Sequence, residues 1–319
     1  MKKQYQNIGA QIINLKTNKH IDGETIVLEC FSEKTYLDLI TPYSDLISIG
    51  RDKYGKHVYS ENINFDEYIE FNKIDYAICC RLQTIIGCFE KMVKNFLMHK
   101  YCEKMKGSGD KQVKDYSWIE RYNNGQSCFD LLKIDETFAE GTMQQANLDM
   151  ISRRKGVLTK IKELEKSNNN ENYIVSHYQR KYGYIPMFVA IHSLSLGQLL
   201  TLFMMLKQDD KNELLCLFNS TKNKRYSDLQ IEKFEKDIGR IYVIRNIVNH
   251  YEPIFPFIQN TENRTFSSLT NIFEKLTSYY KRTNSYFIEP FDVTKNYKSR
   301  NSYSLTFHLK IEKVLEALK

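Results

Sequence analysis

Arg245 and His250 lie five residues apart in a short stretch whose side chains could handle a phosphate and a proton. A guanidinium presents paired N–H donors to a phosphate. An imidazole titrates near neutral pH, so it can accept or donate a proton. These residue types fit acid–base chemistry on a phosphate ester. The Arg-x4-His pattern is short, however, and the same residues could be an ion-paired arginine and a helix-capping histidine.

The spacing of this motif decides which of its side chains share a helix face. Apolar residues before it recur at three- and four-residue intervals, which predicts a helix over 228–252 that stops at the following proline. Positions five apart are about 140° apart on a helix with ~3.6 residues per turn. Arg245 therefore shares a face with Asn249, and Asn246 with His250. A site that contains both the Arg245 and the His250 side chain therefore needs the long arginine side chain to reach around the helix, or a second copy of the helix.

The composition favours a helical protein of one large domain or two ordinary ones. Of 319 residues, 42% are hydrophobic, and only 5 Pro and 13 Gly occur, which favours long helices. A net charge of +7 is compatible with a nucleic-acid partner without requiring one. The 7 Cys include no metal-binding spacing, and the N-terminus has no apolar leader segment. We therefore expect a reduced cytoplasmic protein with no bound metal.

Helical spacing recurs outside the motif. It predicts a long helix from about 64 to 104, a charged amphipathic helix over 143–167 and a further helix over 266–282. Met187–Leu206 carries no formal charge and is long enough to raise the question of a membrane span. Its hydroxyl and histidine side chains favour a single buried helix instead. Near the C-terminus we expect an extended piece over Ser304–Leu309, followed by a helix.

Three stretches of the sequence resemble the Abi (abortive infection) proteins of bacteria, members of the HEPN superfamily. Residues 64–94 are similar to the first long helix of that family, with its pattern D…E-x-x-x-[RK]. Residues 184–199 are similar to its segment P-[IV]-W-x-x-x-E-x-x-[ST]-F-G, and residues 245–250 match R-N-x-x-x-H. The sequence departs from the pattern at Phe188, where tryptophan is expected, and at His192, where an acidic residue is expected.

The order and separation of the three stretches agree with the family over roughly residues 10–260. The resemblance implies an all-α, HEPN-type helical bundle with helical or irregular insertions and an accessory C-terminal segment. On this basis we expect a helical extension over 1–62, a HEPN-like domain over 63–283 with an insertion at about 105–172, and a C-terminal segment over 284–319.

The resemblance also implies an activity, which is metal-independent cleavage of RNA without a cofactor. His250 would be the general acid or base and Arg245 the phosphate clamp, while Asn246 and Asn249 would hold the geometry or bind the RNA. Because the chain has one such motif, we expect a symmetric homodimer with two motif helices at the two-fold axis. The alternative is an RNA-binding HEPN protein that forms a ribonucleoprotein with a small noncoding RNA and has little or no nuclease activity of its own.

Both alternatives need basic surface near the motif helix, although charged surface residues are usually only solvated. The candidate RNA-binding residues are Lys94, Arg180, Lys181, Lys224, Arg225 and Arg240. Glu90 borders the apolar stripe of the first long helix, where it could orient Arg245 or remain a solvated edge carboxylate. His192 could be a polar core residue or a second site residue.

Overall fold

The structure is a computed structural model in which the fold is all-α, as the sequence predicts. It describes residues 7–19, 21–22, 39–59, 63–106, 156–157, 159–161, 163–164, 172–183, 185–261, 263–283 and 305–319. Packing contacts divide the chain into two units. Unit 1 is residues 1–86 with 243–319, and unit 2 is residues 87–242. The expected division at residues 62 and 283 stays a prediction.

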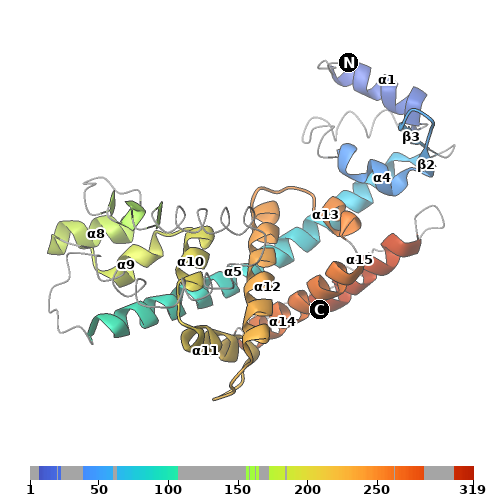
Figure 1. The fold of residues 1–319 in the computed structure, drawn as a ribbon. Helices are drawn as coiled ribbons and strands as arrows, with labels where there is room; N and C mark the ends of the chain where they lie inside the picture. The colour runs from blue at the N-terminus through green and yellow to red at the C-terminus, as the bar shows by residue number, and fades with distance from the viewer. Residues whose placement is uncertain are drawn as a thin grey trace, which may run out of the picture. The chain divides into compact units, whose positions relative to one another are not determined.

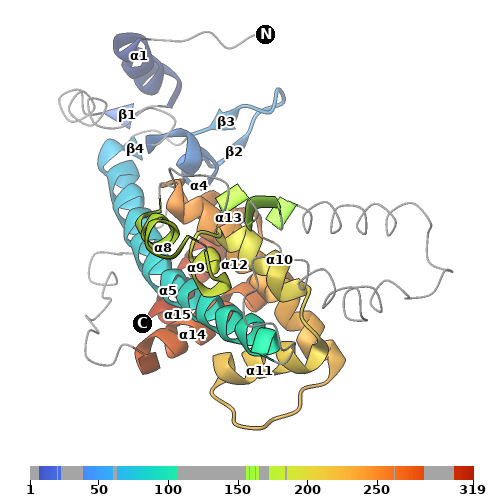
Figure 2. The same ribbon diagram turned by 90° about the vertical axis from the view of Figure 1, so that its left-hand side faces the viewer.

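Helix α5 (Phe65–Lys106) contributes its first half to unit 1 and its second half to unit 2. Its bounds confirm the long helix predicted from about 64 to 104. The prediction succeeds because the apolar stripe is unbroken, and the stripe residues Ile78, Leu82, Ile85 and Phe89 are fully buried. Figures 1 and 2 show α5 as a long continuous helix.

Unit 1 contains short elements before α5 and a helical layer after the motif. The short elements are α1 (Ile8–Lys19), β1 (Ile21–Asp22), η1 (Thr41–Tyr43), α4 (Ser44–Ile47), β2 (Gly50–Arg51), β3 (His57–Val58) and β4 (Ile63–Asn64). The strands form only two-residue pairs, β1 parallel to β4 and β2 antiparallel to β3. The helices after the motif are α13 (Phe255–Asn260), α14 (Asn263–Thr283) and α15 (Leu305–Leu318).

Helices α14 and α15 lie side by side in both ribbon views (Figures 1 and 2). The extended piece expected over Ser304–Leu309 is wrong from Leu305 onward, where α15 is already helical. Burial against α14 favours the helix, since the helically spaced Ile311, Val314 and Leu318 are all fully buried. The bounds of α14 confirm the helix predicted over 266–282.

Besides the second half of α5, the described residues of unit 2 include four helices and the first part of α12. They are α8 (Tyr173–Tyr182), α9 (Met187–His192), α10 (Leu196–Met204), α11 (Gln208–Asn219) and α12 (Asp228–Asn249). The single helix expected over Met187–Leu206 is wrong, because Ser193–Ser195 separate α9 from α10. Ser195 and Gln198 form a capping box that starts the second helix. No helix within the described ranges has the length and apolar character that crossing a membrane requires.

Candidate functional site

The motif lies at the C-terminal end of α12, which stops at Asn249 rather than at residue 252. The Glu252 N–H donates to the Ile247 carbonyl at 3.0 Å, and the Tyr251 N–H to Val248 at 3.3 Å. This pair of bonds is a Schellman ending with His250 at the C-cap. Tyr251 has φ of +56°, a left-handed conformation that usually takes glycine or asparagine. The turn thus places His250 at the exposed tip of the helix.

Arg245 is half-buried and is held by the two asparagines of the motif. One of its terminal nitrogens lies 3.5 Å from the Asn246 side-chain oxygen. With the Asn249 amide turned so that its oxygen faces the guanidinium, Arg245 Nε donates at 3.0 Å and a terminal nitrogen at 3.3 Å. Arg245 and Asn249 therefore share a helix face, as their spacing predicts. These contacts fix the guanidinium plane.

Asp75 on α5 holds the chain that follows His250, a role that the sequence reasoning missed. Its carboxylate accepts hydrogen bonds from the Ile254 N–H at 2.8 Å, the Phe255 N–H at 3.3 Å and the Tyr43 hydroxyl at 3.1 Å. The thiol of Cys79, one turn further along α5, lies 3.7 Å from the Glu252 carbonyl oxygen. Asp75 thus satisfies N–H groups at the start of α13 and anchors the segment after the motif.

Burial governs the acid–base properties of this anchor. It raises the pKa of Asp75 to about 6, although the N–H donors of Ile254 and Phe255 act to lower it. Burial also raises the pKa of the Tyr43 hydroxyl and of the Cys79 thiol, and the Asp75 charge raises both further. The Tyr43 and Cys79 protons therefore stay in place near neutral pH, and Asp75 is the titrating member of this cluster.

A cavity of about 360 Å³ opens beside the helix end. Its lining residues are Tyr43, Asn72, Asp75, Tyr76, Cys79, His250, Tyr251, Glu252 and Pro253. The His250 side chain is exposed, so its imidazole can reach a ligand from solvent. Around the motif, the structure thus combines a reachable imidazole, a fixed guanidinium and an anchored backbone. Within the described ranges, no group of three or more His, Cys, Asp or Glu side chains could hold a metal ion.

The other candidate residues belong to unit 2, whereas the motif belongs to unit 1. Their placement beside the motif therefore stays a prediction, and so does pairing of Glu90 with Arg245. Lys94 Nζ lies 3.5 Å from the His192 carbonyl oxygen, at the end of α9. The His192 side chain is exposed, and desolvation followed by the Lys94 charge lowers its pKa.

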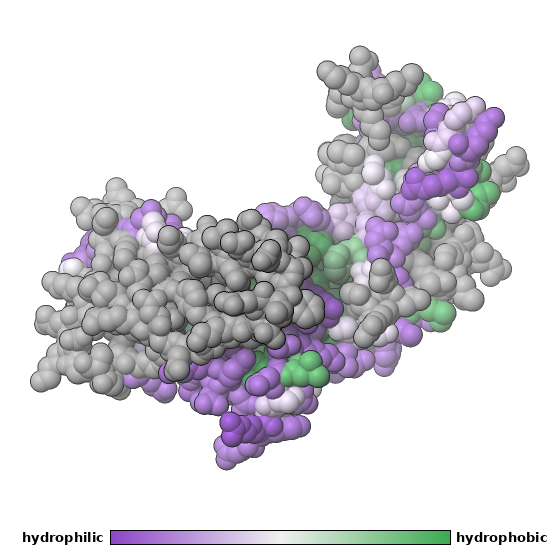
Figure 3. All heavy atoms as spheres, in the orientation of Figure 1, coloured by the Kyte–Doolittle hydropathy of each residue, from purple (hydrophilic) through white to green (hydrophobic). Residues whose placement is uncertain are grey.

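The remaining basic candidates of unit 2 occupy different surroundings. Arg240 pairs with Asp237 one helical turn away, at 3.2 Å. Lys224 and Arg225 are exposed in the loop between α11 and α12, where the Lys224 ammonium lies 4.8 Å from the Tyr226 ring centre. The lower end of the molecule in Figure 3, where Figure 1 draws this loop, is a hydrophilic projection. Arg180 and Lys181 lie in the last turn of α8.

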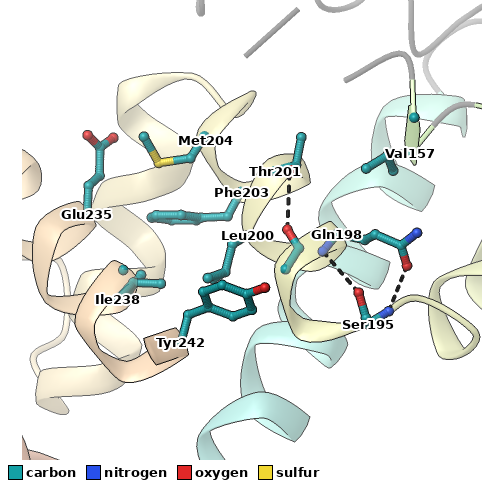
Figure 4. Close-up of a pocket in the computed structure, with 13 residues that line it drawn as sticks. Val157, Ser195, Gln198, Leu200, Thr201, Phe203, Met204, Glu235, Ile238 and Tyr242 are labelled. Atoms are coloured by element: carbon teal, nitrogen blue, oxygen red, sulfur yellow. Dashed lines mark hydrogen bonds between the residues drawn. The ribbon is translucent and has the colours of Figure 1, made fainter. Parts of the chain in front are cut away.

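A second cavity, of about 680 Å³, lies within unit 2 between α10 and α12 (Figure 4). Its walls include the side chains of Leu200, Phe203 and Ile238. Three polar side chains that line it serve the start and first turns of α10: Ser195 and Gln198 cap one another, and Thr201 donates to the Gly197 carbonyl at 3.1 Å. These polar groups have structural roles in α10.

A model of the family described as Abi-like protein matches residues 32–256, which is most of the chain. The match includes α5, the α9–α10 segment and the motif at the end of α12. The chain therefore belongs to the Abi-like protein family, and this membership supports a general role in abortive infection. No curated protein and no solved structure shows a significant match to it.

Proposed function

We propose that this Abi-like protein is a HEPN-type ribonuclease of abortive infection that cleaves RNA without a metal ion. The observation that carries the proposal is the end of α12, where an exposed imidazole follows a guanidinium whose plane two asparagines fix. An imidazole suits proton transfer near neutral pH. A fixed guanidinium suits the charge of a phosphorane.

The proposed reaction uses a nucleophile within the RNA itself. The 2′-hydroxyl loses its proton and attacks the adjacent phosphorus, and the bond from phosphorus to the 5′-oxygen breaks. The products are a 2′,3′-cyclic phosphate and a free 5′-hydroxyl, so no water or cofactor is consumed. His250 accepts the proton of the 2′-hydroxyl as general base or donates a proton to the leaving 5′-oxygen as general acid. Arg245 stabilises the extra negative charge on the phosphorus oxygens. Asp75 acts through backbone contacts by holding the chain after His250.

The Arg245 and His250 positions point to different sides of one helix end, because five residues correspond to about 140° on a helix. We therefore infer a symmetric homodimer whose site takes the guanidinium from one copy and the imidazole from the other. A two-fold axis near the two motif helices would produce this arrangement with one motif per chain.

The experiment that tests the proposal combines induced expression with cleavage by the purified full-length chain. We expect wild type to arrest growth, degrade cellular RNA and leave 2′,3′-cyclic phosphate ends. His250→Ala and Arg245→Ala should each lower the cleavage rate roughly 10²- to 10⁴-fold, the range for removing one proton-transfer or charge-stabilising group. His99→Ala, which removes an exposed imidazole on α5, should cleave like wild type.

Two results would count against the nuclease. Equal cleavage by wild type and both motif variants would assign the activity to a contaminant, and intact RNA in every sample would remove the activity. In the second case, co-purifying RNA, seen as a high ratio of absorbance at 260 to 280 nm, would favour the alternative of a ribonucleoprotein with a small noncoding RNA.

A further inference from the structure

Helix α8 and the start of α9 carry a continuous row of aromatic rings, which we call the ring row. Its members are Tyr173, His177, Tyr178, Tyr182 and Phe188. Adjacent ring centres are 6.2 Å apart for Tyr173 and His177, 5.9 Å for His177 and Tyr178, and 5.3 Å for Tyr178 and Tyr182. Phe188 lies edge-on to Tyr178, with ring centres 5.6 Å apart. These spacings are those of rings in contact.

Most of the ring row faces solvent. Tyr173 is 75% exposed, Tyr182 49% and Phe188 39%, and the His177 side chain is exposed as well. A contiguous exposed aromatic surface marks a place where a ligand or partner binds, whereas single exposed rings need no explanation. The support beneath it is well defined, because Asn172 caps the start of α8 and Gly183, with φ of +71°, ends it.

The charge around the ring row is positive. Arg180 and Lys181 lie in the last turn of α8, and the Lys181 ammonium lies 5.1 Å from the Tyr182 ring centre. No Asp or Glu occurs in the sequence between Tyr173 and Lys207, so α8, α9 and α10 contain no carboxylate side chain. Helices α8, α9 and α10 therefore combine ring faces with cations and contribute no negatively charged side chain to this surface.

This combination matches the chemistry of an unpaired nucleic-acid strand. Bases stack on exposed aromatic rings whatever their sequence, and cations beside the rings follow the phosphates. A duplex cannot use such rings, because its base faces are already stacked on one another. A purely apolar partner would gain nothing from Arg180 and Lys181, whose charges would lose hydration at the contact.

We propose that the ring row binds single-stranded RNA, with bases stacking on Tyr173 and Tyr182 and phosphates beside Arg180 and Lys181. The choice of RNA as the ligand rests on the proposed function. The ring row belongs to unit 2 and the motif to unit 1.

The test measures binding of a fluorescein-labelled single-stranded RNA oligonucleotide by anisotropy. The full-length chain carries His250→Ala so that the RNA is not cut. Replacing Tyr173 and Tyr182 together by Leu keeps apolar bulk and removes two ring faces, and it should raise Kd at least about tenfold. The matched control is Tyr54→Leu in unit 1, because Tyr54 is 74% exposed and the Lys53 ammonium lies 5.0 Å from its ring centre. The control should bind like its parent.

A second pair of substitutions tests the cations independently of the rings. Arg180→Gln with Lys181→Gln should flatten the slope of log K against log salt by about 1.4, since each phosphate contact to a single strand contributes about 0.7. Both side chains are exposed, so urea unfolding should be unchanged in this variant. An unchanged slope would mean that Arg180 and Lys181 do not contact phosphates of the RNA.

Three further results would overturn the ring row as an RNA site. The first is equal affinity in the tyrosine variant and its parent. The second is equal competition by duplex RNA. The third is a tyrosine variant that binds RNA normally but changes oligomeric state, which would assign the ring row to contact between copies of the chain. Cleavage by wild type is scored separately. If the protein binds RNA through the ring row but does not cleave it, the result supports the ring row and contradicts the nuclease proposal. If wild type cleaves RNA and the tyrosine variant binds RNA as its parent does, the result supports the nuclease proposal and contradicts the ring row.

Discussion

Asp75 ties the chain after His250 to α5 through hydrogen bonds from two backbone N–H groups. Its folded-state pKa of about 6 lies above the ordinary 3.8, so the folded protein holds this proton more tightly than the unfolded chain. The stabilising contribution linked to Asp75 is therefore complete below about pH 4 and is lost as the pH rises to about 6.

Asp75→Asn removes this titration and keeps the shape of the side chain. We expect the free energy of unfolding of wild type, minus that of Asp75→Asn, to fall between about pH 4 and pH 6 and to level off above. Urea unfolding of both proteins at several pH values measures the difference, and other titrating groups cancel because both proteins contain them. A difference that is flat or rises across this interval would show that Asp75 does not titrate there.

For individual residues, the sequence identifies the motif but not the residues that hold it in place. The spacing from Arg245 to Asn249 is visible because helix geometry fixes it locally. Asp75 is visible in the sequence as the aspartate of the pattern D…E-x-x-x-[RK] and as a carboxylate next to Ile74 on an otherwise apolar stripe, but neither feature gives its role. Its partners Ile254 and Phe255 are distant in the sequence, and no local pattern connects them to α5.

At the scale of elements, helices α10 and α12 approach closely at a glycine. A methyl group added at Gly197 would lie 3.2 Å from the Tyr242 ring, whereas one added at Gly239 would meet nothing within 4 Å. We expect Gly197→Ala to lower the free energy of unfolding by about 1 kcal/mol through this crowding. Gly239→Ala, inside α12, should raise it by up to about 1 kcal/mol through lower chain entropy in the unfolded state.

The crowding at Gly197 can be tested by removing its neighbour. In a Tyr242→Ala background, Gly197→Ala should become neutral or stabilising, because the ring that it meets is gone. Urea unfolding of the single and double variants gives the coupling. Equal effects of Gly197→Ala with and without the Tyr242 ring would place the cost elsewhere.

A buried ion pair joins α11 to α12. Lys211 is fully buried, and its Nζ lies 2.8 Å from a Glu235 oxygen whose side chain is 11% exposed. Lys211→Met should cost roughly 3–5 kcal/mol, because it leaves a buried carboxylate without its cation. The double variant Lys211→Met/Glu235→Met should recover most of that loss.

An exposed pair provides the control for this measurement. Lys319 and Glu316 are 2.9 Å apart at the C-terminus, with side chains 46% and 74% exposed. Lys319→Met should change the free energy of unfolding by less than about 1 kcal/mol, since exposed ion pairs contribute little. Equal costs for Lys211→Met and Lys319→Met would mean that burial does not determine the value of these pairs.

The elements themselves were predictable wherever one apolar stripe runs without interruption. α5 and α14 are such cases, and both follow their sequence patterns. The break between α9 and α10 was missed because the apolar run continues through it, although Ser195 and Gln198 have the spacing of a capping box. The start of α15 at Leu305 was missed because α15 as a whole packs against α14, and a local pattern does not contain that contact.

At the scale of the whole molecule, the proposed dimer makes the two motif residues complementary between chains. Arg245→Ala and His250→Ala should each be inactive alone. A mixed dimer of the two variants retains one complete site, so an equal mixture should recover about a quarter of wild-type cleavage if chains exchange freely. The measurement is the cleavage rate after the variants are unfolded and refolded together, compared with each variant treated alone. If the mixture recovers no cleavage, each site needs Arg245 and His250 from the same chain, or it needs the two residues from each of the two chains.

The left-handed backbone of Tyr251 links the stability of the folded protein to the proposed cleavage activity. Its side chain is 67% exposed and its backbone is left-handed, so it contributes little to the core and strains the turn. Tyr251→Gly should therefore make the protein more stable to urea, by up to about 1 kcal/mol. If the same change slows RNA cleavage, the turn beside His250 is a point at which the chain sacrifices thermodynamic stability for catalytic efficiency.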